Sequence, residues 1–137
     1  MVLQTPDGER ARWLKAAWLH DALRDAPAAH ELAHGPLAAE RAVHDGETDQ
    51  GVLSAVRFHS VGYAEWDDVG KMLYLADYLE PGRTFDQELR RALASRVSEE
   101  RDAVLKQVAA RRIARVIDER WPLARETVDF WNALVGY

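Results

Sequence analysis

The chain has 137 residues, 47% of them hydrophobic, which is enough for one domain with an ordinary hydrophobic core. Its net charge of -5 argues against a general nucleic-acid-binding protein, and the absence of cysteine excludes disulfides, thiolate metal sites and cysteine nucleophiles. No apolar run approaches the roughly 20 residues of a membrane span, and no basic-then-apolar leader opens the chain, so we expect a cytoplasmic protein that makes no membrane contact.

Hydrophobic periodicity predicts helices almost throughout the chain and no strands. We expect helices at residues 8–23, 31–44, 48–59, 66–79, 86–95, 98–120 and 124–135. Turn signals separate them, notably Asp45-Gly46, Pro81-Gly82 and Pro122. The prediction is a compact all-α bundle of six to seven helices.

The first helix contains the pair His20-Asp21, where Asp21 continues an apolar face. Leu14, Ala17, Trp18 and Asp21 follow one another at i, i+3, i+4 and i+7. A buried carboxylate costs several kcal/mol unless it is paired or binds a metal. We therefore expect a charged partner or a metal ion next to this pair.

Three later helices repeat this pattern with His34, His59 and Asp77. His34 shares its side with Leu37, Ala38 and Arg41; the apolar stripes that precede the other two are Val52, Ala55 and Val56, and Val69, Met72, Leu73 and Ala76. A single inward histidine is usually a hydrogen-bonded core residue, and a single inward aspartate is usually a cap or an ion-pair partner. Five such side chains on four helices, with His20 and Asp21 included, predict a metal centre.

Histidine and carboxylate ligands without cysteine suit iron, manganese or zinc. An aspartate can bridge two metals with its two oxygens, and two metals roughly 3.5–4 Å apart can clamp a phosphoryl group and generate a nucleophilic hydroxide. The ligand set is therefore typical of an enzyme that hydrolyses phosphate esters or anhydrides.

Several segments resemble a known family. Residues 18–24, WLHDALR, resemble the signature of the HD-domain metal-dependent phosphohydrolases. Residues 56–62, VRFHSVG, and 71–83, KMLYLADYLEPGR, resemble more specifically the YqeK-type branch of that superfamily. Residues 32–40 and 121–134 also fit that branch, so the resemblance extends from about residue 10 to residue 134.

The resemblance implies one HD domain over residues 1–137, shortened at its N-terminus, with a centre of one or two metal ions. Iron is the metal it favours, with manganese or zinc as alternatives. It implies symmetrical hydrolysis of diadenosine tetraphosphate, or a related nucleotide, to two molecules of ADP by a metal-bound hydroxide. By position, one metal corresponds to His20, Asp21 and Asp77 and the other to His34 and His59, with Asp21 as the bridge.

The resemblance also suggests residues that contact substrate. Arg24 stands where the family has a lysine near the attacked phosphate, so Asp21 and Arg24 are the candidate catalytic residues. Candidates for holding phosphates or orienting ligands are Arg57, Lys71, Glu80 and Arg83, and Tyr63 could stack on an adenine. Glu80 and Arg83 fit a structural pair at the Pro81 turn equally well.

One departure from the family concerns its first metal histidine, because no histidine precedes His20. Water, His30 or a neighbouring chain would then have to complete the first metal site. We expect Trp13 and Trp18 to be partly exposed, and a homodimer is one way to cover them. The alternative function is a catalytically degraded HD module that binds a nucleotide or a protein partner, and a purely structural bundle is a third possibility.

Two other features are expected to lie on the protein surface. His44-Asp45 repeats the dipeptide but precedes Gly46, which predicts a surface turn. Arg111, Arg112 and Arg115 share their helix with several carboxylates, which predicts a solvated face of ion pairs.

Overall fold

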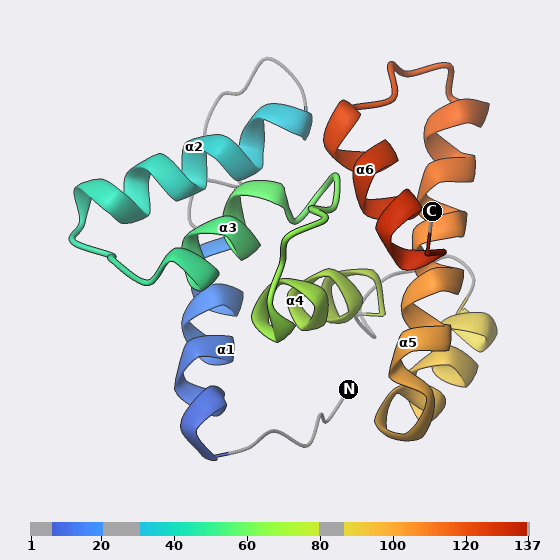
Figure 1. Cartoon of the computed structure of the whole chain (residues 1–137), viewed down its shortest axis with the longest axis horizontal. Coiled ribbons are helices and arrows are strands. Elements are labelled where there is room, and N and C mark those ends of the chain that lie inside the picture. Colours follow the sequence, from blue (N-terminus) through green and yellow to red (C-terminus); the bar gives the residue numbers. More distant parts are fainter. Residues whose placement is uncertain (1–6, 21–30, 80–86, 137) are drawn as a thin grey trace.

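The structure is a computed structural model that describes residues 7–20, 31–79 and 87–136. Its helices are α1 (Asp7–His20), α2 (Glu31–His44), α3 (Gln50–Phe58), α4 (Asp68–Tyr78), α5 (Gln87–Asp118) and α6 (Arg125–Leu134) (Figure 1). The described residues contain no strand, which confirms the all-α prediction. None of the helices among them is long and apolar enough to cross a membrane.

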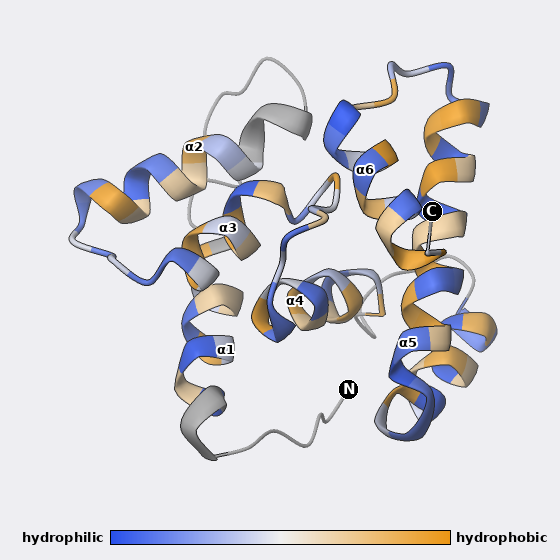
Figure 2. Cartoon of the chain, viewed as in Figure 1, coloured by the Kyte–Doolittle hydropathy of each residue, from blue (hydrophilic) through white to orange (hydrophobic). Residues whose placement is uncertain are grey.

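The helices form two groups that meet at α4. Helix α3 contacts α1, α2 and α4, whereas α5 contacts α4 and α6 (Figure 1). Hydrophobic and hydrophilic residues are interleaved along the helices (Figure 2), so each helix can bury one side. The C-terminal ends of α3 and α4 carry two of the predicted metal ligands, His59 and Asp77.

Helix α1 buries a different side from the one its sequence predicts. Ala16 is fully buried and Trp13 is half-buried, whereas Leu14 and Trp18 are 62% and 80% exposed. The predicted stripe of Leu14, Ala17 and Trp18 is thus the exposed side, and that prediction is wrong. The reason is that α1 has apolar residues on most of its sides, so spacing alone does not single out one face.

Helices α2 and α3 pack closely through small residues. The stripe predicted on α3 is confirmed, because Val52, Ala55, Val56 and His59 are all buried. On α2 the prediction is only partly right: Ala38 is buried, but Leu37 and Arg41 are exposed, and the buried side is completed by Ala39 and Ala42. Alanine side chains allow the two helix backbones to approach.

Gly35 marks the closest approach of α2 to α3. A Cβ atom at this position would fall well inside van der Waals contact of the Arg57 carbonyl oxygen and 3.0 Å from that of Val56. The backbone of α2 next to His34 therefore lies against the last turn of α3, which leads into His59.

A single arginine of α1 connects the N-termini of α3 and α4. The side chains of Asp49 and Asp67 cap these helices by accepting hydrogen bonds from backbone N–H groups of the first turns. Arg12 donates from Nε to Asp49 Oδ2 at 2.7 Å and from Nη2 to Asp67 Oδ2 at 2.9 Å. The guanidinium thus fixes where α3 and α4 begin.

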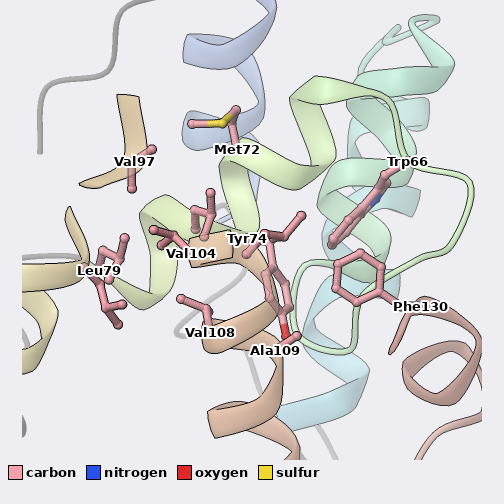
Figure 3. Close-up of a cluster of buried hydrophobic side chains, with 12 residues drawn as sticks. Trp66, Met72, Tyr74, Leu79, Val97, Val104, Val108, Ala109 and Phe130 are labelled. Atoms are coloured by element: carbon pink, nitrogen blue, oxygen red, sulfur yellow. The ribbon is translucent and has the colours of Figure 1, made fainter. Parts of the chain in front are cut away.

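The second group packs on an aromatic cluster of Tyr74, Trp66 and Phe130 (Figure 3). The ring of Tyr74 meets those of Trp66 and Phe130 edge to face, with centroids 5.7 Å and 5.2 Å apart. Helix α5 adds Val104 and Val108 to this core. The cluster ties α4 to both α5 and α6.

The range of α5 comprises two helical segments, as expected, which meet at a kink at Glu100, where φ is -128° and ψ is 41°. This kink lies close to the predicted boundary at residue 98. The predicted buried side of Leu105, Ala109, Ile113, Val116 and Ile117 is only half right. The side chains that are buried are Val104, Leu105, Val108 and Ala109, whereas Ile117 is exposed.

Helix α6 holds the loop that follows His59. Thr127 donates its hydroxyl to the Val61 carbonyl at 2.7 Å. Gly62 adopts φ +89°, a conformation that favours glycine, and a Cβ there would collide with the ring of Phe130. The loop is therefore fixed on the side away from α3.

Candidate functional site

His59 ends α3 with its ring held by the helix itself. The residue is 4% exposed, and its Nδ1 lies 2.6 Å from the Val56 carbonyl oxygen. Because a carbonyl oxygen only accepts, Nδ1 carries the hydrogen, and in the neutral ring Nε2 has the lone pair. Metal-binding histidines typically have one ring nitrogen bonded to a carbonyl oxygen, as Nδ1 of His59 is.

Asp77 lies in the last turn of α4 with a side chain that is 10% exposed. Its Oδ2 accepts a hydrogen bond from Nη2 of Arg112 at 2.9 Å. Nη1 of the same guanidinium donates to the backbone carbonyl of His59 at 3.2 Å. One arginine of α5 thus contacts both predicted ligand residues with described side chains.

The aromatic core supports this arginine. Its Cζ lies 4.3 Å from the centroid of the Tyr74 ring, a cation–π contact. Burial raises the pKa of the Tyr74 hydroxyl, so the ring under Arg112 stays neutral.

Arg112 corrects the prediction of a solvated basic face. Its side chain is 19% exposed and bonded, whereas Arg111 and Arg115 are exposed as expected. The signal for this was in the sequence, since Arg112 follows Leu105 by seven residues and Ala109 by three, on the side of α5 that is buried. It extends an apolar stripe with a charge, just as Asp77 does on α4.

The other predicted ligands are described less fully. Asp21 lies outside the described residues, and for His20 at the end of α1 and His34 in the first turn of α2 only the backbone is described. Among the side chains that are described, no group of three or more His, Cys, Asp or Glu residues could hold a metal. The site as described consists of His59, Asp77 and the arginine between them.

The predicted substrate residues have mixed outcomes. Arg57 and Lys71 are half-buried on α3 and α4, and Arg24, Glu80 and Arg83 lie outside the described residues, as does His30. The Tyr63 ring stacks on Phe58 with centroids 4.2 Å apart, and its hydroxyl donates to Glu65 at 3.2 Å. This hydrogen bond raises the pKa of Tyr63.

Two predictions about the surface are confirmed. His44 and Asp45 are both exposed, and Asp45 accepts a hydrogen bond from Arg41 at 3.1 Å. Trp18 is exposed, and Trp13 is half-buried and packs against the core.

Comparison with known proteins adds relatives for part of the chain. No family model matches it. Proteins named symmetrical bis(5'-nucleosyl)-tetraphosphatase are similar to it: that of Staphylococcus aureus is 40% identical over 55 residues, and that of Bacillus subtilis is 38% identical over 56 residues. These matches span 39% and 40% of this chain but only 28% and 30% of the two relatives.

Among solved structures, the fold resembles a predicted HD superfamily hydrolase involved in NAD metabolism from Clostridium acetobutylicum. The TM-score is 0.67 with 24% sequence identity, over 90% of this chain and 68% of that one. This likeness shows that the two chains share an all-α fold.

Proposed function

We propose that this chain is an HD-domain protein related to the symmetrical bis(5'-nucleosyl)-tetraphosphatases, and that it is a metal-dependent phosphohydrolase acting on dinucleoside polyphosphates. The observation that carries the proposal is the convergence of His59 and Asp77 on one guanidinium at the ends of α3 and α4. The preferred substrate is diadenosine tetraphosphate, cut symmetrically to two molecules of ADP.

The donor set fits a metal ion. Nδ1 of His59 is hydrogen-bonded as in typical metal-binding histidines, and Asp77 is a nearly buried carboxylate whose partner Arg112 also bonds the His59 backbone. We propose His20, Asp21, His34, His59 and Asp77 as the ligands of iron, with manganese or zinc as alternatives. The metal would supply Lewis-acid chemistry that activates water and draws charge from the phosphoryl oxygens.

The backbone of α2 supports including His34. Gly35 lies against the last turn of α3, so the chain at His34 and the chain at His59 approach one another. The contacts of α3 with both α1 and α2 also bring the elements that carry His20 and His34 to the helix that carries His59.

The remaining residues of the proposal bind and orient the substrate. Arg24, Arg57, Lys71 and Arg83 are proposed to hold phosphates, Glu80 to orient a ligand, and Tyr63 to stack on an adenine. Tyr63 already stacks on Phe58, so an adenine would extend an existing aromatic pair rather than meet an isolated ring.

The test combines metal content with product analysis. Protein loaded with iron or manganese is expected to retain metal and to convert diadenosine tetraphosphate to ADP, and Asp21→Ala is expected to abolish turnover. His44→Ala removes the exposed histidine of the second His-Asp pair and is the matched control. Protein that binds no metal under these conditions sinks the proposal, and turnover that survives Asp21→Ala shows a contaminating enzyme or a wrong site.

The second candidate is an HD module that binds a nucleotide or protein partner without turnover. It is favoured by the ion pair of Asp77 with Arg112, which gives this carboxylate a partner without a metal. Metal or nucleotide binding without ADP formation would support it over the hydrolase.

A homodimer is a separate proposal, and it rests on the exposed Leu14 and Trp18 of α1. Sedimentation velocity should give the mass of two chains, and Trp18→Arg should reduce it to one.

A cytoplasmic location is a further proposal, and fractionation of cells expressing the tagged full-length protein tests it.

A further inference from the structure

We infer that Arg112 is a positioning residue that sets the placement of His59 relative to Asp77 by holding the end of α3 and the Asp77 carboxylate together. The inference rests on the proposed function, because its importance lies in the metal that these two side chains would share. It concerns a residue that contacts neither substrate nor metal.

The first step is the pair of contacts made by one rigid group. Nη2 of Arg112 donates to Asp77 Oδ2 at 2.9 Å and Nη1 donates to the His59 carbonyl at 3.2 Å. A guanidinium is planar, with donors in a fixed fork, so these two acceptors cannot shift independently. The distance between the end of α3 and the Asp77 carboxylate is therefore controlled from α5.

The second step is the anchoring of the guanidinium itself. Cζ of Arg112 lies over the ring of Tyr74, which is 1% exposed and wedged between Trp66 and Phe130. Figure 3 shows Tyr74 and Phe130 side by side in this core. The arginine is supported by a buried hydrophobic cluster, so its two contacts are held by the core rather than by solvent-exposed chain.

The third step is the orientation of the His59 ring. The ring is bonded through Nδ1 to Val56 within α3, and the backbone of the same residue is bonded to Arg112. Ring and backbone are thus each fixed by a separate partner. A change at Arg112 that shifted the end of α3 would therefore also shift the His59 ring.

The contacts of Arg112 favour positioning over phosphate binding. Both of its Nη atoms are bonded within the protein, and its side chain is mostly buried. An arginine that is to receive a phosphate needs donors directed outward. Arg57 and Lys71, which are half-buried on α3 and α4, are the residues proposed for that role.

The test measures manganese binding to metal-free protein by calorimetric titration. This measurement does not depend on enzymatic activity. Arg112→Met keeps the length of the aliphatic stem and removes both donors, and it should weaken binding about 10–100-fold, the usual effect of losing a residue that orients a metal ligand. Arg112→Lys keeps the charge but cannot make the two-point contact, so it should lie between. Arg111→Met removes the same charge from the exposed neighbouring position and should bind as wild type.

Kinetics give a second readout, in which Arg112→Met should lower kcat for diadenosine tetraphosphate and leave KM close to wild type. Manganese binding by Arg112→Met that equals or exceeds wild type overturns the inference. If circular dichroism shows that Arg112→Met is unfolded, Arg112→Lys decides, and wild-type affinity in that variant overturns it. Wild-type protein that binds no manganese or iron contradicts the proposed function instead, so the two failures are distinguishable.

Discussion

Arg12 donates from Nε to Oδ2 of Asp49 at 2.7 Å, while Oδ1 of the same carboxylate caps the first turn of α3. The arginine reaches the cap of α4 as well, through Asp67. One side chain of α1 therefore aligns two helices whose opposite ends carry His59 and Asp77.

Removing this arginine should destabilise the fold. Arg12→Leu leaves both caps without their charged partner, and we expect a loss of about 1–2 kcal/mol in the free energy of unfolding, as for partly exposed ion pairs joined to helix caps. Urea denaturation followed by circular dichroism measures it. Arg10→Leu changes an exposed arginine two residues earlier in α1 and is the control. An equal effect of both changes would contradict this role for Arg12.

The same ion pair predicts how stability depends on pH. The hydrogen bond from Arg12 lowers the pKa of Asp49 from its ordinary 3.8 to about 2. A lowered folded-state pKa adds stability above about pH 4, which is lost as the pH falls toward 2. With Asp49 28% exposed, we expect this to amount to about 1–2 kcal/mol after solvent screening.

Asp49→Asn tests this pH dependence, because asparagine still caps a helix but does not titrate. The urea midpoint of Asp49→Asn at pH 6 should be lower than that of wild type. The difference between the two midpoints should shrink at pH 3 and below. Asp102→Asn changes an exposed aspartate and is the control. A difference that stays constant from pH 6 to pH 2.5 would show that the carboxylate charge contributes nothing.

Gly35→Ala should be destabilising although alanine favours helices by about 1 kcal/mol over glycine. The added methyl group would strike the Arg57 carbonyl oxygen, which is backbone and cannot swing aside. Overpacking of this kind typically costs about 1–3 kcal/mol, so we expect a net loss measurable by thermal unfolding. Glu40→Ala, at an exposed site of the same helix, controls for helix propensity, and a more stable Gly35→Ala would refute the close approach.

Removing metal should lower the melting temperature. A ligand bound to the folded state alone stabilises it by about 2.7 kcal/mol at a concentration one hundred times its dissociation constant. Adding a chelator to the loaded protein should therefore lower Tm by several degrees, and Asp77→Asn should make the chelator ineffective. His44→Ala should behave as wild type, and a chelator effect that persists in Asp77→Asn would place the metal elsewhere.

The sequence was sufficient for the parts of the fold where one helix face is clearly apolar. Val52, Val56 and His59 recur at helical spacing, so the buried side of α3 followed directly. Helix α1 has tryptophan and leucine on opposite sides, so its spacing is compatible with two different buried faces. Only the packing of α3 and α4 against Ala16 decides between them.

The sequence indicated candidate ligands, but the role of Arg112 beside two of them was not predicted. His59 and Asp77 each stand at the end of a local apolar pattern, which is visible within one helix. The contact of Arg112 with Asp77 joins residues 35 positions apart, and the apolar spacing of α4 does not predict it. A long basic side chain is usually solvated, so three arginines within five residues suggested a surface rather than a buried partner.

The contact between Arg112 and Asp77 also determines the order in which the molecule can be assembled. Helices α3 and α4 contact each other and α1, all of which precede α5 in the chain, and α4 gains its contacts with α5 and α6 later. A growing polypeptide can therefore form both of these helices on the ribosome before the arginine that fastens their ends together has been synthesised. Contacts between residues far apart in the sequence slow folding, so the contact of Arg112 with Asp77 should form later than the helices themselves.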